Sequence, residues 1–374
     1  MFGLIIAFAL LTRLWNLNVP SGYYFDEVYN AFTTQEFVKG NKDAYEWSYT
    51  STVLGTAYGW THPPTAKLIS ALGILIFGDN SFGWRVGSAI MGTLCIALIY
   101  LISKELMPKP YALLASLFAS LDGLILVQSR INMNDIHALF FILLCFYAFV
   151  KYKKNLLFLS ISLGLLIATK WTGLYALAIF GWRKNILAIL IMIAGIYLLS
   201  YSQYFWLGGT LTNFWELQKQ MWWYNTGLTA THTYQSSWWT WPLMIRTVWY
   251  YVDYQKTTIA NIYALGNPIL WWLGIPTILY TIYKRKWLIV IGFLTFWLPW
   301  ARAPRIMFLY HYLPSVPFLC MALAYSLSQF RNKILTFIIL SLTILSFVYF
   351  LPIWIGLPVP KEFVNQYFWL PSWR

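Results

Sequence analysis

The sequence has few charged residues and few cysteines for a chain of 374 residues. Only 10% of its residues are charged, and just 12 of them are acidic. Soluble globular domains have about 25% charged residues, so this composition excludes an ordinary soluble protein. The cysteines Cys95, Cys145 and Cys320 all lie inside apolar runs, so we expect neither a disulfide framework nor a metal site from them.

Apolar and aromatic residues dominate instead. Hydrophobic residues make up 59% of the chain and aromatic residues 20%, and the mean hydropathy is +0.58. Several apolar runs approach the ~20 residues that a helix needs to cross a bilayer. The composition therefore predicts an all-α polytopic membrane protein. The first apolar segment carries no small-residue cleavage site, so we expect it to remain as a helix.

The apolar runs predict about eleven spans within a single transmembrane domain, residues 1–374. Two long stretches between them, residues 18–82 and 207–267, lack a long clean apolar run and are expected to be large loops. The expected spans lie near the following residues: 2–17, 82–102, 110–127, 135–151, two within 155–182, 185–206, 268–283, 287–301, 306–328 and 334–351. The last four form a C-terminal membrane portion, residues 268–351.

The net charge of +14 is dispersed in short basic clusters between the apolar runs, which favours a role in membrane topology over nucleic-acid binding. With the N-terminus in the cytoplasm, the short basic connections also lie there, balanced only by Glu105. These connections carry Lys104, Lys109, Lys151, Lys153, Lys154, Arg183, Lys184, Lys284, Arg285, Lys286, Arg331 and Lys333. We therefore predict a multi-pass plasma membrane protein whose two large loops and C-terminus are extracytoplasmic.

Most of the unexplained polar residues then gather on the outer face. They are Arg13, Asp26, Glu27, His62, Lys67, Arg130, Asp135, Lys170, His232, Arg302, Arg305 and His311. A carboxylate among several cations suits a lipid phosphate, because the cations stabilise a departing phosphate and the carboxylate can take a proton from a hydroxyl. The alternative is that Asp26 and Glu27 cap or solvate a surface helix and that the cations snorkel at the interface.

Several motifs, in order along nearly the whole chain, resemble the protein O-mannosyltransferase family of the GT-C class of membrane glycosyltransferases. The resemblance extends from Thr12-Arg13 to the segment 310–314. It is carried by Phe25-Asp26-Glu27-Val28, Thr61-His62-Pro63-Pro64 with Lys67, Ser129-Arg130 followed by Asp135, Lys170-Trp171-Thr172-Gly173-Leu174, residues 230–236 and 238–243, Gly266-Asn267-Pro268 and Tyr310-His311-Tyr312-Leu313-Pro314.

The resemblance implies that mannose is transferred from polyprenyl-phosphate-mannose to Ser or Thr hydroxyls of translocated proteins, with inversion. Asp26 would be the general base and Glu27 would help to hold the acceptor. Arg130, Arg13 and Lys170 would face the donor phosphate or shape its pocket. No cofactor and no divalent metal are expected, and the partners would be the bilayer, the acceptor protein and, as a further candidate, the translocation machinery.

The remaining candidate substrate-binding residues are Lys67, Asp135, His232, Arg305, His311 and His62. His62 either orients the first loop or the sugar, or has a purely structural role. The tryptophan-rich second loop either binds sugar or acceptor or anchors the chain at the membrane interface.

The second loop is too short for the β-trefoil domain that the eukaryotic members insert there, which favours a prokaryotic type. One alternative keeps the GT-C fold but transfers another sugar onto a lipid or glycan. A second alternative is a solute transporter, but the chain shows no internal repeat and its polar residues gather on one face.

Overall fold

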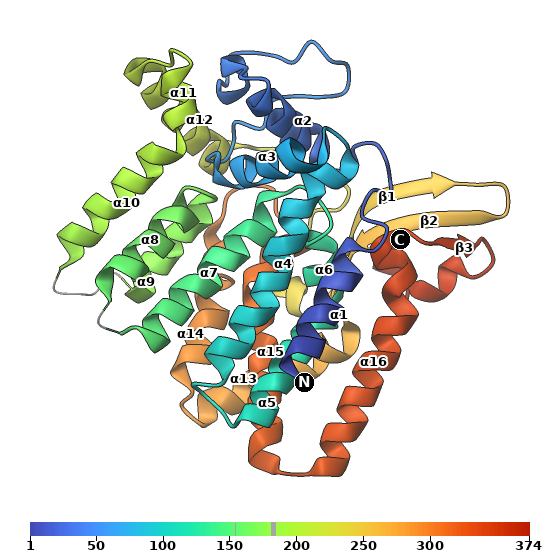
Figure 1. The fold of residues 1–374 in the computed structure, drawn as a ribbon. Coiled ribbons are helices and arrows are strands. Elements are labelled where there is room, and N and C mark those ends of the chain that lie inside the picture. The colour runs from blue at the N-terminus through green and yellow to red at the C-terminus, as the bar shows by residue number, and fades with distance from the viewer. Residues whose placement is uncertain (154, 181–184) are drawn as a thin grey trace.

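The structure is a computed structural model that describes residues 1–153, 155–180 and 185–374. It is a mostly helical bundle, and the helices α2, α3, α11 and α12 gather at one end of it (Figure 1). We call this end the site end. The predicted cytoplasmic residues Lys154, Arg183 and Lys184, and Trp182 at the expected end of the sixth span, lie outside the described residues.

Four helical segments are long and apolar enough to cross a membrane: α4 (Ser81–Ser103), α7 (Asn134–Lys151), Leu309–Phe330, which joins η5 (Leu309–Ser315) to α15 (Val316–Phe330), and α16 (Lys333–Ile355). Shorter apolar helices are α1 (Phe2–Leu14), α3 (Thr65–Phe77), α8 (Leu156–Ile167), α10 (Ile186–Ser200) and α13 (Pro268–Tyr283). Two more are Trp171–Phe180, which contains η2 (Trp171–Ala176) and α9 (Leu177–Phe180), and Trp287–Arg302, which contains α14 (Trp287–Thr295) and η4 (Leu298–Arg302). All except α3 coincide with expected spans; the count of eleven stays a prediction.

The two expected loops fold into short elements at the site end. The first contains α2 (Glu27–Val38), η1 (Lys42–Tyr45) and α3. The second contains α12 (Leu211–Gly227) and η3 (Trp238–Leu243), and α11 (Ser202–Trp206), at the end of the expected seventh span, comes just before it. A small aromatic core joins them, because Phe37 and Tyr45 pack with Tyr201, Tyr204 and Phe214. The two loops therefore form one layer over the helical bundle.

A three-stranded antiparallel sheet departs from the all-α expectation. Strand β2 (Thr258–Ala264) lies between β1 (Val248–Tyr254) and β3 (Pro358–Pro360) (Figure 1). The strands β1 and β2 are rich in aromatic and β-branched residues, which suit a pleated surface. Because β3 comes from the segment after α16, the pairing joins parts of the chain that are distant in sequence.

A buried carboxylate lies where the expected third span is interrupted between α5 (Lys109–Ser120) and α6 (Gly123–Gln128). Asp122 caps α6 by accepting a hydrogen bond from the backbone N–H of Ile125 (2.9 Å). It also accepts bonds from the N–H of Asn267 (3.1 Å) and from Nε1 of Trp271 (2.7 Å). The Asn267 amide donates in turn to the carbonyls of Leu121 and Thr343. The Gly266-Asn267-Pro268 motif therefore connects α13 to α5, α6 and α16.

We predict that Asp122→Ala lowers the free energy of unfolding by at least ~2 kcal/mol, because it leaves several buried donors without an acceptor. Thermal unfolding of the purified protein in detergent micelles measures this change. The exposed Glu362→Ala variant is the control and should stay within about 0.5 kcal/mol of the wild type. Equal melting temperatures for the two variants would contradict the role given to Asp122.

Candidate active site

A cavity of about 610 Å³ lies at the site end, between the first loop, the second loop and the segment before α15. It brings together predicted site residues that are far apart in sequence. These are Asp26, His62, Asp135, Lys170, His232, Arg305 and His311. The cavity is therefore the candidate active site.

The backbone before α2 directs Asp26 into this cavity. Phe25 has a left-handed φ of +49°, which is strained for a bulky residue. Its ring stacks on Tyr250 of β1 at 3.9 Å, with the planes 16° apart, and meets the edge of Tyr310 at 5.9 Å. These contacts hold the turn, and Asp26 follows as the N-cap residue of α2.

The Asp26 side chain accepts no hydrogen bond from the described residues, although its backbone carbonyl accepts one from Asn30. The Asp26 side chain is half-buried, and its exposed part faces the cavity. Burial among the surrounding protein atoms raises the pKa of Asp26 to about 7. The nearby Asp135 also raises the pKa, whereas Lys170 and Arg305 lower it. A carboxylate with a pKa near neutrality is suited to take up a proton.

Asp135 and Lys170 form a largely buried ion pair in the cavity wall. The Lys170 Nζ lies 2.7 Å from Oδ1 of Asp135, and the two side chains are only 9% and 8% exposed. Asp135 lies in the first turn of α7, and Lys170 precedes η2 (Trp171–Ala176). The pair holds a positive charge at a defined place in a site of low dielectric constant.

Arg305 closes another side of the cavity. Its guanidinium donates to Oδ1 of Asn225 (2.7 Å) and lies over the Tyr224 ring, 5.4 Å from the centroid. The Arg305 Nε has no hydrogen-bond partner among the described residues. The end of α12 thus positions a cation beside the cavity.

The three cavity histidines differ in their surroundings. Burial, together with the charges of Lys170, Lys67 and Arg305, holds the pKa of His62 well below its usual range, so this ring is neutral at pH 7. Its Nδ1 has no partner in the described part of the chain. His311 is held by the backbone of Phe308 and by the Trp300 ring, at 4.2 Å. His232 packs against Phe308 at 5.3 Å.

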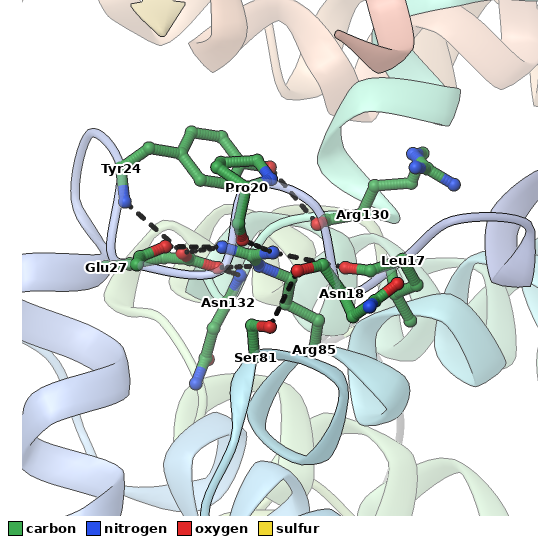
Figure 2. Close-up of polar contacts among 10 residues, drawn as sticks. Leu17, Asn18, Pro20, Tyr24, Glu27, Ser81, Arg85, Arg130 and Asn132 are labelled. Atoms are coloured by element: carbon green, nitrogen blue, oxygen red, sulfur yellow. Dashed lines mark hydrogen bonds and ion pairs between the residues drawn. The ribbon is translucent and has the colours of Figure 1, made fainter. Parts of the chain in front are cut away.

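Glu27, the neighbour of Asp26, does not line the cavity but forms a fully buried ion pair with Arg85 of α4 (Figure 2). The Arg85 Nε and NH2 groups donate to its two oxygens at 2.8 and 2.7 Å. The backbone N–H groups of Asn132 and Tyr24 also donate to this carboxylate. Glu27 therefore anchors the loop from inside, and its expected contact with the acceptor stays untested.

Arg85 is a residue that the sequence analysis did not select. Its guanidinium also donates to the carbonyls of Leu17, Pro20 and Gly22, at 3.1, 2.6 and 2.9 Å, so it gathers the whole segment before Asp26 (Figure 2). Arg85 could have been selected from the sequence because it lies inside an apolar run, where an arginine requires a buried partner.

Three predicted cations also lie outside the cavity lining. Arg130 donates to the carbonyls of residues 12, 13, 15 and 16 and so caps the end of α1. Arg13 is fully buried and donates to Ser129 and Ala9. Lys67 is buried beneath the Gly59 segment, and its Nζ has no partner among the described residues. The structure does not bring these three to Asp26.

We predict that Arg85→Lys loosens the segment before Asp26. The single ammonium group of lysine cannot donate two parallel bonds to the Glu27 carboxylate and also bond to three backbone carbonyls. Chymotrypsin cleavage at residues 23–25 should accelerate about tenfold, since proteolysis follows local opening. The exposed Arg285→Lys variant is the control and should be cleaved at the wild-type rate. Equal rates for all three proteins would contradict the anchoring role of Arg85.

Comparison with known sequences places these residues in a family context. The family model described as dolichyl-phosphate-mannose-protein mannosyltransferase matches residues 3–225, and that of the C-terminal four TMM region of protein-O-mannosyltransferase matches 210–289 and 280–373. A polyprenol-phosphate-mannose–protein mannosyltransferase of Mycobacterium tuberculosis is 24% identical over 84% of this chain and 81% of its own. One of Corynebacterium glutamicum is 26% identical over 100% and 93%.

Solved structures give the same architecture. The S. cerevisiae protein O-mannosyltransferase Pmt1-Pmt2 complex bound to the sugar donor is similar with a TM-score of 0.80, at 16% identity, over 100% of this chain and 92% of that chain. ArnT from Cupriavidus metallidurans in the apo state is similar with a TM-score of 0.62, at 14% identity, over 87% and 59%. At these identities the likeness shows the GT-C fold alone.

Proposed function

Because the chain belongs to the dolichyl-phosphate-mannose–protein mannosyltransferase family, we propose that it transfers mannose from a polyprenyl phosphate to Ser or Thr hydroxyls of proteins, with Asp26 as general base. The observation that carries the role of Asp26 is its carboxylate, which accepts no hydrogen bond from the described residues and lies in a cavity with Lys170 and Arg305. A base that the protein leaves unpaired remains available to a substrate hydroxyl.

In the proposed reaction, Asp26 takes the proton of the acceptor hydroxyl while the hydroxyl oxygen attacks the anomeric carbon of mannose. The bond between that carbon and the phosphate oxygen breaks, and the polyprenyl phosphate leaves with the bonding electrons. Attack opposite the leaving group inverts the anomeric centre. Lys170 and Arg305 supply the positive charge that a departing phosphate needs, so the mechanism requires neither a metal ion nor a cofactor.

An open groove beside the cavity is the proposed route of the acceptor. The groove, about 710 Å³, runs between residues 228–237 and 304–307 and shares Arg305, Thr231 and Ala230 with the cavity. Small and polar side chains such as Thr229 and Ser236 line it. An extended acceptor segment with small side chains would fit there and present its hydroxyl toward Asp26.

We further propose that the site end is extracytoplasmic and that the N-terminus is cytoplasmic. The helix α4 begins at the site end, and Lys104 follows its opposite end, where the short basic connections are expected in the cytoplasm. A translocated protein would then reach the cavity from outside. The alternative function, transfer of another sugar to a lipid or glycan, uses the same fold. The identity of the acceptor that carries the label in a transfer assay distinguishes the two functions.

The Asp26→Asn variant tests the proposed base, because it keeps the side-chain shape and removes the carboxylate. Transfer of radiolabelled mannose from polyprenyl-phosphate-mannose to a Ser/Thr-rich peptide in membranes should fall ~10²-fold or more. Asp253→Asn, on β1 outside the cavity, is the control and should keep the wild-type rate. Label in a lipid instead of the peptide would overturn the acceptor, and a fast Asp26→Asn variant would overturn the base.

The pH dependence tests the electrostatics of the cavity. Asp26 acts as a base only when ionised, so kcat/KM should rise with pH and level off above about 7. Asp135→Asn removes a nearby negative charge and leaves Lys170 unpaired, and both changes favour the ionised form of Asp26. The midpoint of the pH profile should therefore move to lower pH in this variant. A midpoint that does not move, or that moves to higher pH, would contradict this coupling.

A further inference from the structure

The helix α12 has three distinct faces. Phe214, Leu217 and Met221 are buried against the protein. Leu211, Trp215 and Trp222 are 74%, 63% and 60% exposed. Their spacings of four and seven residues place them on one side of a helix with 3.6 residues per turn, and we call them the Trp stripe. The exposed stripe is therefore separate from the face that packs in the protein.

The third face of α12 is mostly polar: it contains Asn213, Glu216, Lys219 and Gln220, together with Trp223, which is 56% exposed. Lys219 and Gln220 both bond to the Glu216 carboxylate, at 3.0 Å each. These residues already pair with one another on the surface, as residues that face water do. A helix with a protein face, an apolar face and a water face fits the boundary between lipid and water.

The position of α12 relative to α10 identifies what covers the Trp stripe. Of the residues of α10, only Ile189, Ile193 and Ser200 are buried, and its apolar surface must face lipid. The chain passes from α10 through α11, whose Trp206 is 85% exposed, directly into α12 at the site end (Figure 1). The Trp stripe thus begins where the lipid-facing surface of α10 ends.

A hydrogen-bonded link fixes α12 to this lipid-facing helix. The Tyr197 hydroxyl of α10 donates to Oε1 of Gln218 in α12 at 2.6 Å and accepts from Nε1 of Trp171 at 3.1 Å. Trp171 in turn contacts Trp222 of the stripe, with ring centroids 6.4 Å apart. The depth of α12 is therefore set by that of α10.

We propose that the Trp stripe of α12 seats in the membrane interface on the site end, so that the lipid surface is the partner of this helix. Trp side chains suit this layer because they are apolar and carry one N–H that can reach water or a head group. The seating also has a bearing on the site, because the last turn of α12 carries the Tyr224 and Asn225 that hold Arg305 beside the cavity.

The test uses the full-length protein in nanodiscs of phosphatidylcholine and phosphatidylglycerol at a ratio of about 3:1, which imitates an anionic membrane surface. Trp215→Cys and Asn213→Cys are labelled separately with bimane, since the native Cys95, Cys145 and Cys320 are buried. Asn213 is the matched control, because it is exposed on the polar face of the same helix.

Brominated lipid should quench the label at 215 at least ~twofold and leave the label at 213 nearly unchanged, because an interfacial helix buries its apolar face among the acyl chains. Aqueous iodide should quench the label at 213 more strongly. Equal quenching of both labels by iodide would overturn the proposal, since the stripe would face water. Protection of the label at 215 from both quenchers would also overturn it, because a second copy or another protein would then cover the stripe.

A second experiment connects the seating of α12 to the proposed mannosyl transfer. Of the two experiments, only this one rests on the proposed function. Replacing Trp215 and Trp222 together by Ser should raise the KM for polyprenyl-phosphate-mannose about threefold or more and change kcat little, because a misplaced α12 shifts the cavity wall. Replacement of both by Tyr should restore the wild-type KM. An unchanged KM in the Ser variant would overturn the link to the site, whereas the quenching result needs no turnover and stands apart from the proposed function.

Discussion

Glu27 and Arg85 are opposite charges that have been removed from water together, and the geometry of the cavity depends on them. Burying an ion pair carries a desolvation cost of several kcal/mol per ion. Here the remaining donors of Arg85 are used by the carbonyls of Leu17, Pro20 and Gly22. Glu27 also accepts hydrogen bonds from the backbone N–H groups of Tyr24 and Asn132. The pair therefore holds one carboxylate inside the protein and leaves its neighbour, Asp26, free to face the cavity.

Several of the spans, and some of the residues that line the cavity, could be predicted from the sequence because they show in local patterns. Apolar runs such as 82–102 and 334–351 coincide with α4 and α16, since the bilayer sets the length of a helix. Asp135 and Lys170 stand out as ionisable residues beside apolar runs, and the structure pairs them at 2.7 Å. Residues of this kind require partners in a membrane protein wherever they occur.

The remaining features could not be predicted because they depend on pairing across long separations. Glu27 and Arg85 are 58 residues apart, and the bond from Asn267 to Asp122 spans 145 residues. The sheet is a similar case, because β2 obtains its second neighbour from residues after α16. The family resemblance implied that Arg130 and Arg13 face the donor phosphate or shape its pocket, but it could not show that Arg130 donates to the end of α1 and Arg13 to Ser129 and Ala9.

The pairing of β3 with β2 has a consequence for the order of events during biosynthesis. The sheet packs on the turn before Asp26 through Tyr250 and Phe25, and Trp373, from the segment after β3, donates to the carbonyl of Met244 just before β1. The first loop emerges early from the ribosome, but residues 358–373, which complete the surface that supports it, are made much later. A nascent chain thus carries Asp26 long before residues 358–373 can support its loop.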